Sequence, residues 1–181
     1  MHDDAHDNLE PNLTEIFGEH VRAEIVLESS QPSASLVVCN MSYRPKDMDS
    51  NSRIVRQTAV VLETNDLDLP QFALSPRRNS LRSNFASALT GGITLKFEDS
   101  PEFSEAFHLL GWAEGAVRAG FHKGVHDYFL KERSWSVRGH RNRLVIFRHN
   151  SVCDDQDVDA FVHDGQQILA LFRDAEARLD E

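Results

Sequence analysis

The spacing of apolar residues between positions 92 and 148 changes period twice within a short length of chain, and this pattern constrains the fold most strongly. In GITLKF (92–97) every second residue is apolar, as in a half-buried β-strand. AVRAGFHKGVHDYF (116–129) repeats its apolar residues with the period of an α-helix. WSVRGHRNRLVIFR (135–148) returns to strand spacing around a polar turn. Strands and helices that alternate in this way predict an α+β fold.

Strand patterns dominate the N-terminal half. AEIVLES (23–29), LVVCNMSY (36–43) and IVRQTAVVLET (54–64) follow one another with polar or turn-prone connectors, which predicts an antiparallel meander. NDLDLPQFALSP (65–76) is less regular. Because Pro70 has no backbone N–H, this piece is predicted to be an edge strand or an extended loop.

Two amphipathic helices are predicted in the C-terminal half. One extends from about Glu114 to Lys131, and the other begins near Asp155 or Asp157. EFSEAFHLLGW (102–112) fits a helix or a strand, and we interpret it as a strand because it ends at glycine before a stronger helix. The predicted fold is therefore a mainly antiparallel sheet of roughly five to eight strands, with these two helices packed on one face.

Composition and charge limit the class of protein. Residues 1–12 are acidic and polar, so they are predicted to be a flexible segment, and residues 13–181 to be a single domain. The N-terminus lacks the basic and apolar stretches of a signal peptide, which predicts a soluble cytoplasmic protein. The net charge of −10 argues against a general affinity for nucleic acid or anionic lipid. Of the two cysteines, Cys39 alternates with apolar residues, which favours a buried thiol over a nucleophile.

The order of segments resembles an uncharacterised bacterial domain family. QTAVVLETNDLDLPQFALSP is followed by a strand, PEFSEAFHLLGW, AVRAGF, a hairpin containing tryptophan and a closing amphipathic helix. The resemblance covers about residues 53–172 and implies a strand over Phe103–Gly111. Domains of this family are often the soluble part of proteins that carry membrane spans, so the resemblance implies membrane contact only through a partner. It brings no catalytic residues.

His122 and His126 are four residues apart in the predicted helix, as two metal ligands would be. A zinc-protease helix places a glutamate after the first histidine, whereas this chain has Lys123 there. Asp127 and His108 are candidates to complete a site. The favoured interpretation places the two histidines at the border of the buried stripe, and a metal site is the alternative.

Basic residues gather in two predicted loops. The first group lies at the hairpin tip beside Trp135 and comprises Arg138, His140, Arg141 and Arg143. The second comprises Arg77, Arg78 and Arg82. Basic groups beside an aromatic ring can hold phosphate or stack on a base, and a solvated turn accounts for the same residues without a ligand. If the two groups met in space, they would form an anion site.

These observations do not specify a reaction. Dinucleotide, phosphate-loop and nucleophile-elbow patterns are missing from the sequence. The leading hypothesis is a non-catalytic interaction or ligand-binding module of a bacterial protein, without catalytic residues, metal or cofactor. The alternative is an enzyme or metal-binding protein that uses His122 and His126. A protein partner remains open, and the sequence does not indicate an oligomeric state.

Overall fold

The structure, a computed structural model, describes residues 4–17, 20–44, 54–77 and 91–177. Within these ranges, eight strands form one antiparallel sheet in the order β1-β2-β3-β8-β7-β4-β6-β5. The strands are β1 Val21–Gln31, β2 Ala34–Tyr43, β3 Val55–Thr64, β4 Leu69–Pro76, β5 Ile93–Leu95, β6 Phe107–Gly111, β7 Ser136–Arg141 and β8 Arg143–Phe147. The helices are α1 Asp4–Phe17, α3 Pro101–Ala106, α4 Glu114–Gly120, α5 Lys123–Lys131 and α6 Val158–Ala177. The predicted α+β class with a mainly antiparallel sheet is confirmed.

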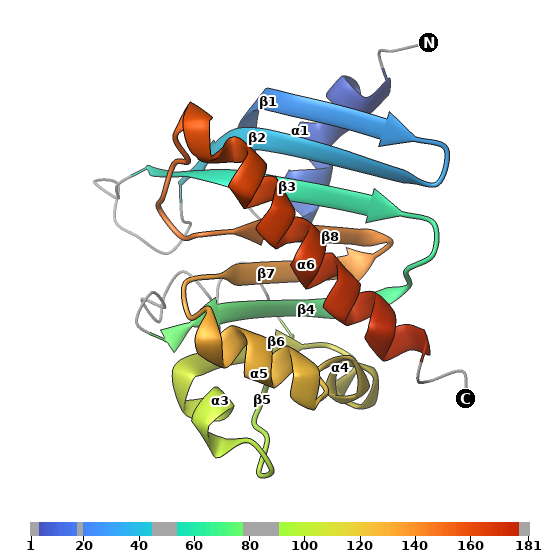
Figure 1. Ribbon diagram of the computed structural model, residues 1–181, viewed down its shortest axis with the longest axis vertical. Helices are drawn as coiled ribbons and strands as arrows, with labels where there is room; N and C mark the ends of the chain where they lie inside the picture. Colours follow the sequence, from blue (N-terminus) through green and yellow to red (C-terminus); the bar gives the residue numbers. More distant parts are fainter. Residues whose placement is uncertain (1–3, 18–19, 45–53, 78–90, 178–181) are drawn as a thin grey trace.

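Helices lie on both faces of the sheet (Figure 1). Helix α6 crosses the front face diagonally, and α1 lies behind β1 and β2. The front core combines residues of α4, α5 and α6 with apolar side chains of the sheet. A second core lies between α1 and the back of β1, β2, β3 and β8. No helix in the described ranges is both long and apolar enough to cross a membrane.

Helix α1 corrects the prediction of a flexible segment over residues 1–12. The helix begins at Asp4 and ends at Phe17, and Leu9, Leu13 and Phe17 are all buried. Their spacing follows one helical face. The sequence NLTEIFGEHV indicates a short helix with Leu13, Ile16 and Phe17 on one face, and the structure extends this helix toward the N-terminus, so that Leu9 joins the same face.

The first three strands form the predicted antiparallel meander. Strand β4, in contrast, is not at the sheet edge, because it pairs with β7 on one side and β6 on the other. Pro70 does not interrupt these ladders. The register with β7 shifts between Leu69 and Phe72, and the ladder with β6 begins only at Phe72. The missing N–H therefore falls where no ladder hydrogen bond is needed.

The segment predicted as a strand over Phe103–Gly111 is divided between helix α3 and strand β6. β5 is shorter than predicted and ends at Leu95. The backbone N–H of Phe97 instead donates to Ser104 Oγ at 2.8 Å, and the Phe97 ring packs against Phe103. Local side-chain contacts thus replace further pairing at this edge of the sheet.

The helix predicted from Glu114 to Lys131 consists of two helices, α4 and α5. α4 ends at Gly120, and Phe121 and His122 separate the two. His122 Nδ1 accepts a hydrogen bond from the backbone N–H of Gly124 at 3.0 Å, so the imidazole caps the start of α5. The predicted hairpin of β7 and β8 is confirmed, and the final helix follows a single 3₁₀ turn over Asp155–Asp157.

Candidate functional site

The histidines that suggested a metal site lie in different environments. His126 is only 3 % exposed, and its ring packs against both Phe97 and Phe103, with centroids 4.4 and 4.3 Å away. His122 caps α5 through Nδ1. Asp127, a candidate third ligand, pairs instead with Lys123 at 2.7 Å.

His108, the other candidate ligand, alternates along β6 with Phe107 and Leu109, which both belong to the front core. Because neighbouring side chains of a strand point to opposite faces, His108 is on the back face. The histidines of α5 therefore do not meet it. No cluster of three potential metal ligands occurs among the described residues.

Burial lowers the pKa of His126, because the charged imidazolium loses its hydration against two phenylalanine rings. Asp99 and Asp127 oppose this effect, while His122 and Lys123 add to it. Nε2 of His126 is buried without a hydrogen-bond partner among the described residues. A proton on this ring would therefore be poorly stabilised in the folded state.

We expect His126 to make the free energy of unfolding decrease as the pH is lowered. Its folded pKa lies below the unfolded value of about 6.5, so the unfolded chain binds the proton more tightly. The stabilisation by the neutral ring is complete above that pH and is lost as the pH falls through the folded pKa. Urea unfolding from about pH 8 to about pH 5 should show a steeper loss for the natural chain than for His126→Phe. Equal pH dependence in both would contradict this assignment.

The basic residues of the β7–β8 hairpin do not form one surface. Arg138 is 6 % exposed, its Nη1 donates to the carbonyl of Ile16 at 3.1 Å, and its guanidinium lies 4.1 Å from the Phe17 ring centroid. Arg143 pairs with Glu63 at 3.1 Å. The interpretation of Arg138 as a loop residue is wrong, because it belongs to β7 and lies beneath the C-terminal turn of α1, where a cation is favoured.

The two predicted basic groups also lie apart. Arg141, at the hairpin tip, is opposite Leu69 at the start of β4, whereas Arg77 follows Pro76 at the end of the same strand. Eight residues of chain therefore separate the two positions along β4, a length of roughly 25 Å. Arg78 and Arg82 lie outside the described residues.

The two cysteines pack against different cores. Cys39 is fully buried in the back core, and burial raises the pKa of its thiol to about 12. Cys153 packs against the front core, and burial also raises the pKa of this thiol. The thiolate is the reactive form of cysteine, so neither thiol is suited to act as a nucleophile near neutral pH.

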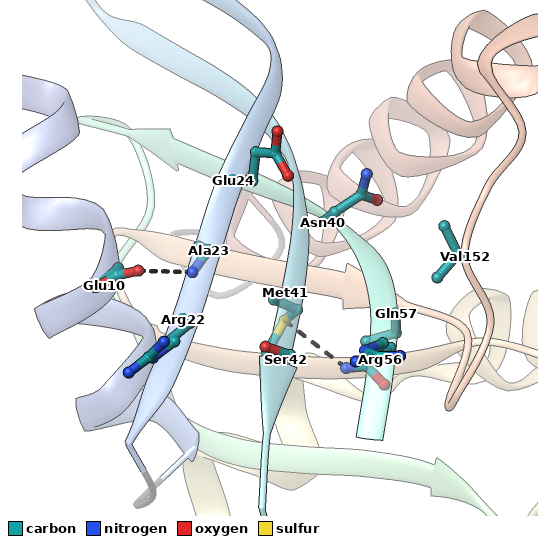
Figure 2. Close-up of a pocket in the computed structure, with 10 residues that line it drawn as sticks. All are labelled: Glu10, Arg22, Ala23, Glu24, Asn40, Met41, Ser42, Arg56, Gln57 and Val152. Carbon is teal, nitrogen blue, oxygen red and sulfur yellow. Dashed lines mark hydrogen bonds between the residues drawn. The ribbon is translucent and has the colours of Figure 1, made fainter. Parts of the chain in front are cut away.

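A cleft of about 510 Å³ lies where β1 and β3 begin and β2 ends (Figure 2). Three strands, α1 and the loop after β8 contribute to it. Its lining residues are Glu10, Arg22, Ala23, Glu24, Asn40, Met41, Ser42, Arg56, Gln57 and Val152. None of the histidines discussed above is among them.

A row of polar side chains crosses this cleft. Arg22 of β1 is opposite Ser42 of β2, and Ser42 is opposite Arg56 of β3. The three share the front face, because their neighbours Val21, Met41, Tyr43 and Val55 belong to the back core. Figure 2 shows the two arginines on either side of Ser42. The backbones of β1 and β3 are roughly 10 Å apart across the row, so two long side chains can reach one small anion above Ser42.

Neither Arg22 nor Arg56 makes an ion pair within the described part of the chain, and both are exposed. Five other cations in the described ranges have carboxylate partners, whereas some, such as Lys96 and Arg141, do not. The five paired cations are Arg118, Lys123, Arg143, Arg148 and Arg173. The row thus carries two positive charges without an ion-pair partner in the described ranges, and the acidic residues Glu10 and Glu24 line the same cleft.

A second row follows two residues along the strands, with Glu24 opposite Asn40 and Asn40 opposite Thr58. The backbone N–H of Cys153 donates to Thr58 Oγ1 at 2.8 Å, and that hydroxyl donates to Asn40 Oδ1 at 2.6 Å. The amide oxygen of Asn40 is therefore occupied, and its NH₂ group remains as a donor.

The loop after β8 forms one wall of the cleft and is fixed to β3. Asn150 N–H donates to Gln57 Oε1 at 3.2 Å, and Thr58 N–H donates to the carbonyl of Ser151 at 3.0 Å. Val152, between these contacts and Cys153, is 53 % exposed. On the other side, Glu10 of α1 accepts a hydrogen bond from Ala23 N–H at 2.8 Å. The cleft is therefore bounded by groups that are held in place by the fold.

One residue of this site, Arg56, stands out weakly in the sequence. Arg56 interrupts an otherwise apolar face of its strand, which is unusual where a face is buried. Arg22 and Ser42 occupy ordinary polar positions, and only strand register places them beside Arg56. Comparison of the chain with protein-family models gave no match, and comparison with curated proteins gave none.

Proposed function

We propose that this chain is a non-catalytic ligand-binding module that holds a small anionic molecule in the cleft over β1, β2 and β3. The observation that carries the proposal is the row in which Arg22 and Arg56, without ion-pair partners in the described structure, flank the hydroxyl of Ser42. Guanidinium groups bind carboxylate and phosphate oxygens through paired, charge-assisted hydrogen bonds. The Ser42 hydroxyl would donate a further bond to the same anion.

Binding without catalysis fits the chemistry of the lining. Ser42 has no histidine beside it among the lining residues to act as a general base. Cys39 and His126, whose pKa values are shifted, belong to the two cores and not to this cleft. We do not propose the metal-binding alternative, because His122 caps a helix and His126 is packed against two phenylalanine rings. Helices α5 and α6 would then serve as a scaffold for the sheet.

Titration calorimetry with acetate, succinate and inorganic phosphate at low ionic strength tests the proposal. We expect at least one of these anions to bind, with an affinity that falls as salt is added. The double variant Arg22→Gln and Arg56→Gln should weaken that binding by at least about tenfold, because each charged hydrogen bond contributes more than about 1.4 kcal/mol.

The control is the double variant Lys131→Gln and Arg133→Gln, which removes the same charge at the end of α5. It should bind the anion as the natural chain does. Equal loss in both double variants would mean that net charge alone governs binding. That result, or no binding of any anion by the natural chain, would refute the proposed function.

A further inference from the structure

We infer that the ligand of this cleft is a linear zwitterion, with a carboxylate on the row of Arg22, Ser42 and Arg56 and an ammonium group on Glu24. The inference rests on the proposed function and adds the chemical class of the ligand. It follows from the second row of the cleft, which places an acidic side chain beside the two arginines on the same face.

The carboxylate of Glu24 is available to a ligand. Glu10, the other acidic residue of the lining, accepts the hydrogen bond from Ala23 N–H. Glu24 is exposed and makes no ion pair within the described ranges. In Figure 2, Glu24 and Asn40 lie toward the same end of the cleft, and Ser42 lies toward the other. A ligand cation therefore has one preferred end.

Strand geometry sets the separation of the two ligand charges. Glu24 and Arg22 are two residues apart on β1, so the two rows are separated by roughly 7 Å along the strands. An α-amino acid, in which one carbon separates the two charged groups, is too short to extend between them. A linear ω-amino acid or a dipeptide has several bonds between its ammonium and carboxylate groups and fits the spacing.

The surroundings of the rows suit the middle of such a ligand. Val152 offers an exposed apolar side chain on a loop that is hydrogen-bonded to Gln57 and Thr58. This wall can contact methylene groups. The NH₂ group of Asn40, left as a donor by the bond from Thr58 to its amide oxygen, can bind a carbonyl. The contact with Val152 favours an ω-amino acid, and the contact with the Asn40 NH₂ group favours a dipeptide. Both kinds of ligand have an ammonium group at one end and a carboxylate at the other.

Calorimetric titrations with matched probes test this inference. The first pair is ε-aminocaproate and hexanoate, which differ in the ammonium group. The second pair is glycylglycine and N-acetylglycylglycine, in which acetylation removes the terminal charge. We expect the zwitterion of at least one pair to bind about tenfold more tightly than the partner without a charged ammonium group, as one additional charged contact would give. The pair with the larger difference identifies the spacer.

Variants separate this inference from the proposed function. Glu24→Gln should abolish the preference for the zwitterion and leave the affinity for hexanoate the same or slightly higher. Glu15→Gln, an exposed acidic residue on α1, should keep the preference. The double variant Arg22→Gln and Arg56→Gln should weaken all four probes.

Equal binding of hexanoate and ε-aminocaproate, together with equal binding of the two dipeptides, would overturn the zwitterion inference while the anion-binding function stands. A preference that survives in Glu24→Gln would also overturn it. If none of the four probes, acetate, succinate and phosphate binds to the natural chain, the proposed function itself fails.

Discussion

Replacing Phe121 or Phe172 by alanine should lower the free energy of unfolding by about 3–5 kcal/mol in each case. Both side chains are 1 % exposed. Their rings are 5.5 Å apart, and both pack on Phe72 of β4, at 5.0 and 5.2 Å. This triad joins the end of α4, the middle of the sheet and α6. Each substitution would leave a cavity lined by the two remaining rings, because a close-packed core cannot fully relax to fill the space.

Urea unfolding of the two variants and of Ile93→Ala measures the effect. Ile93, on the edge strand, is 46 % exposed, so its truncation should cost less than about 1 kcal/mol. Because Phe121 and Phe172 are in contact, the double variant should lose less than the sum of the single losses. A loss below about 1 kcal/mol for either phenylalanine would contradict its place in the front core.

Phe17→Ala should have a comparable effect on the back core, with a loss of about 3–5 kcal/mol. The Phe17 ring is 1 % exposed and packs on Tyr43 and Phe147, with centroids 5.4 and 5.3 Å away. It also packs against the guanidinium of Arg138, which lies 4.1 Å from the ring centroid. Without this ring, α1 would lose its aromatic contacts with the sheet, and Arg138 would lose the ring on which its guanidinium packs.

Two measurements check the docking of α1. Urea unfolding gives the loss of stability, and amide hydrogen exchange reports whether α1 opens separately from the sheet. We expect Phe17→Ala to increase exchange in α1 more than in β3. Glu15→Ala, at an exposed position of the same helix, should change neither. A stability loss below about 1 kcal/mol would show that α1 is not part of the folded core.

Local patterns predicted most of the strands because burial of one face imposes a period of two that the sequence records directly. The hairpin of β7 and β8 was predicted in this way. The start of the final helix was predicted from the acidic residues that precede it. The position of β4 inside the sheet was not predicted from such patterns, because β4 pairs with residues of β7 and β6 that are more than thirty positions away. Pro70 suggested an edge strand, although it falls at a register shift where its missing donor has no consequence.

The break between α4 and α5 illustrates a different limit. Phe121 and Val125 repeat at helical spacing, so the apolar pattern continues through the break. Gly120 and Gly124 were the local signs of it, and glycine is a weak signal within a helix. The capping role of His122 could be recognised only once the turn was known. For this reason, its spacing from His126 resembled that of a metal-ligand pair.

The candidate site depended on tertiary structure throughout. Arg22, Ser42 and Arg56 are fourteen or more positions apart, and a slip of one residue in either register would move one of them to the other face. The hairpin arginines, adjacent in sequence, gave the stronger local signal. Alternation along β7 and the cover by α1 instead place Arg138 in the interior. Proximity in sequence was therefore a poor guide to which charges lie together on an exposed face of the sheet.

The proposed function requires Arg22, Ser42 and Arg56 to bind a single anion. Heteronuclear NMR of the side-chain Nε–H groups of arginine during titration with ε-aminocaproate and with phosphate tests this directly. We predict saturable shifts at Arg22 and Arg56 with one shared dissociation constant, together with a shift of the Ser42 amide, and none at Arg141. Shifts at Arg141 of equal size, or no saturable shift at Arg22 and Arg56 with either anion, would contradict the proposed function.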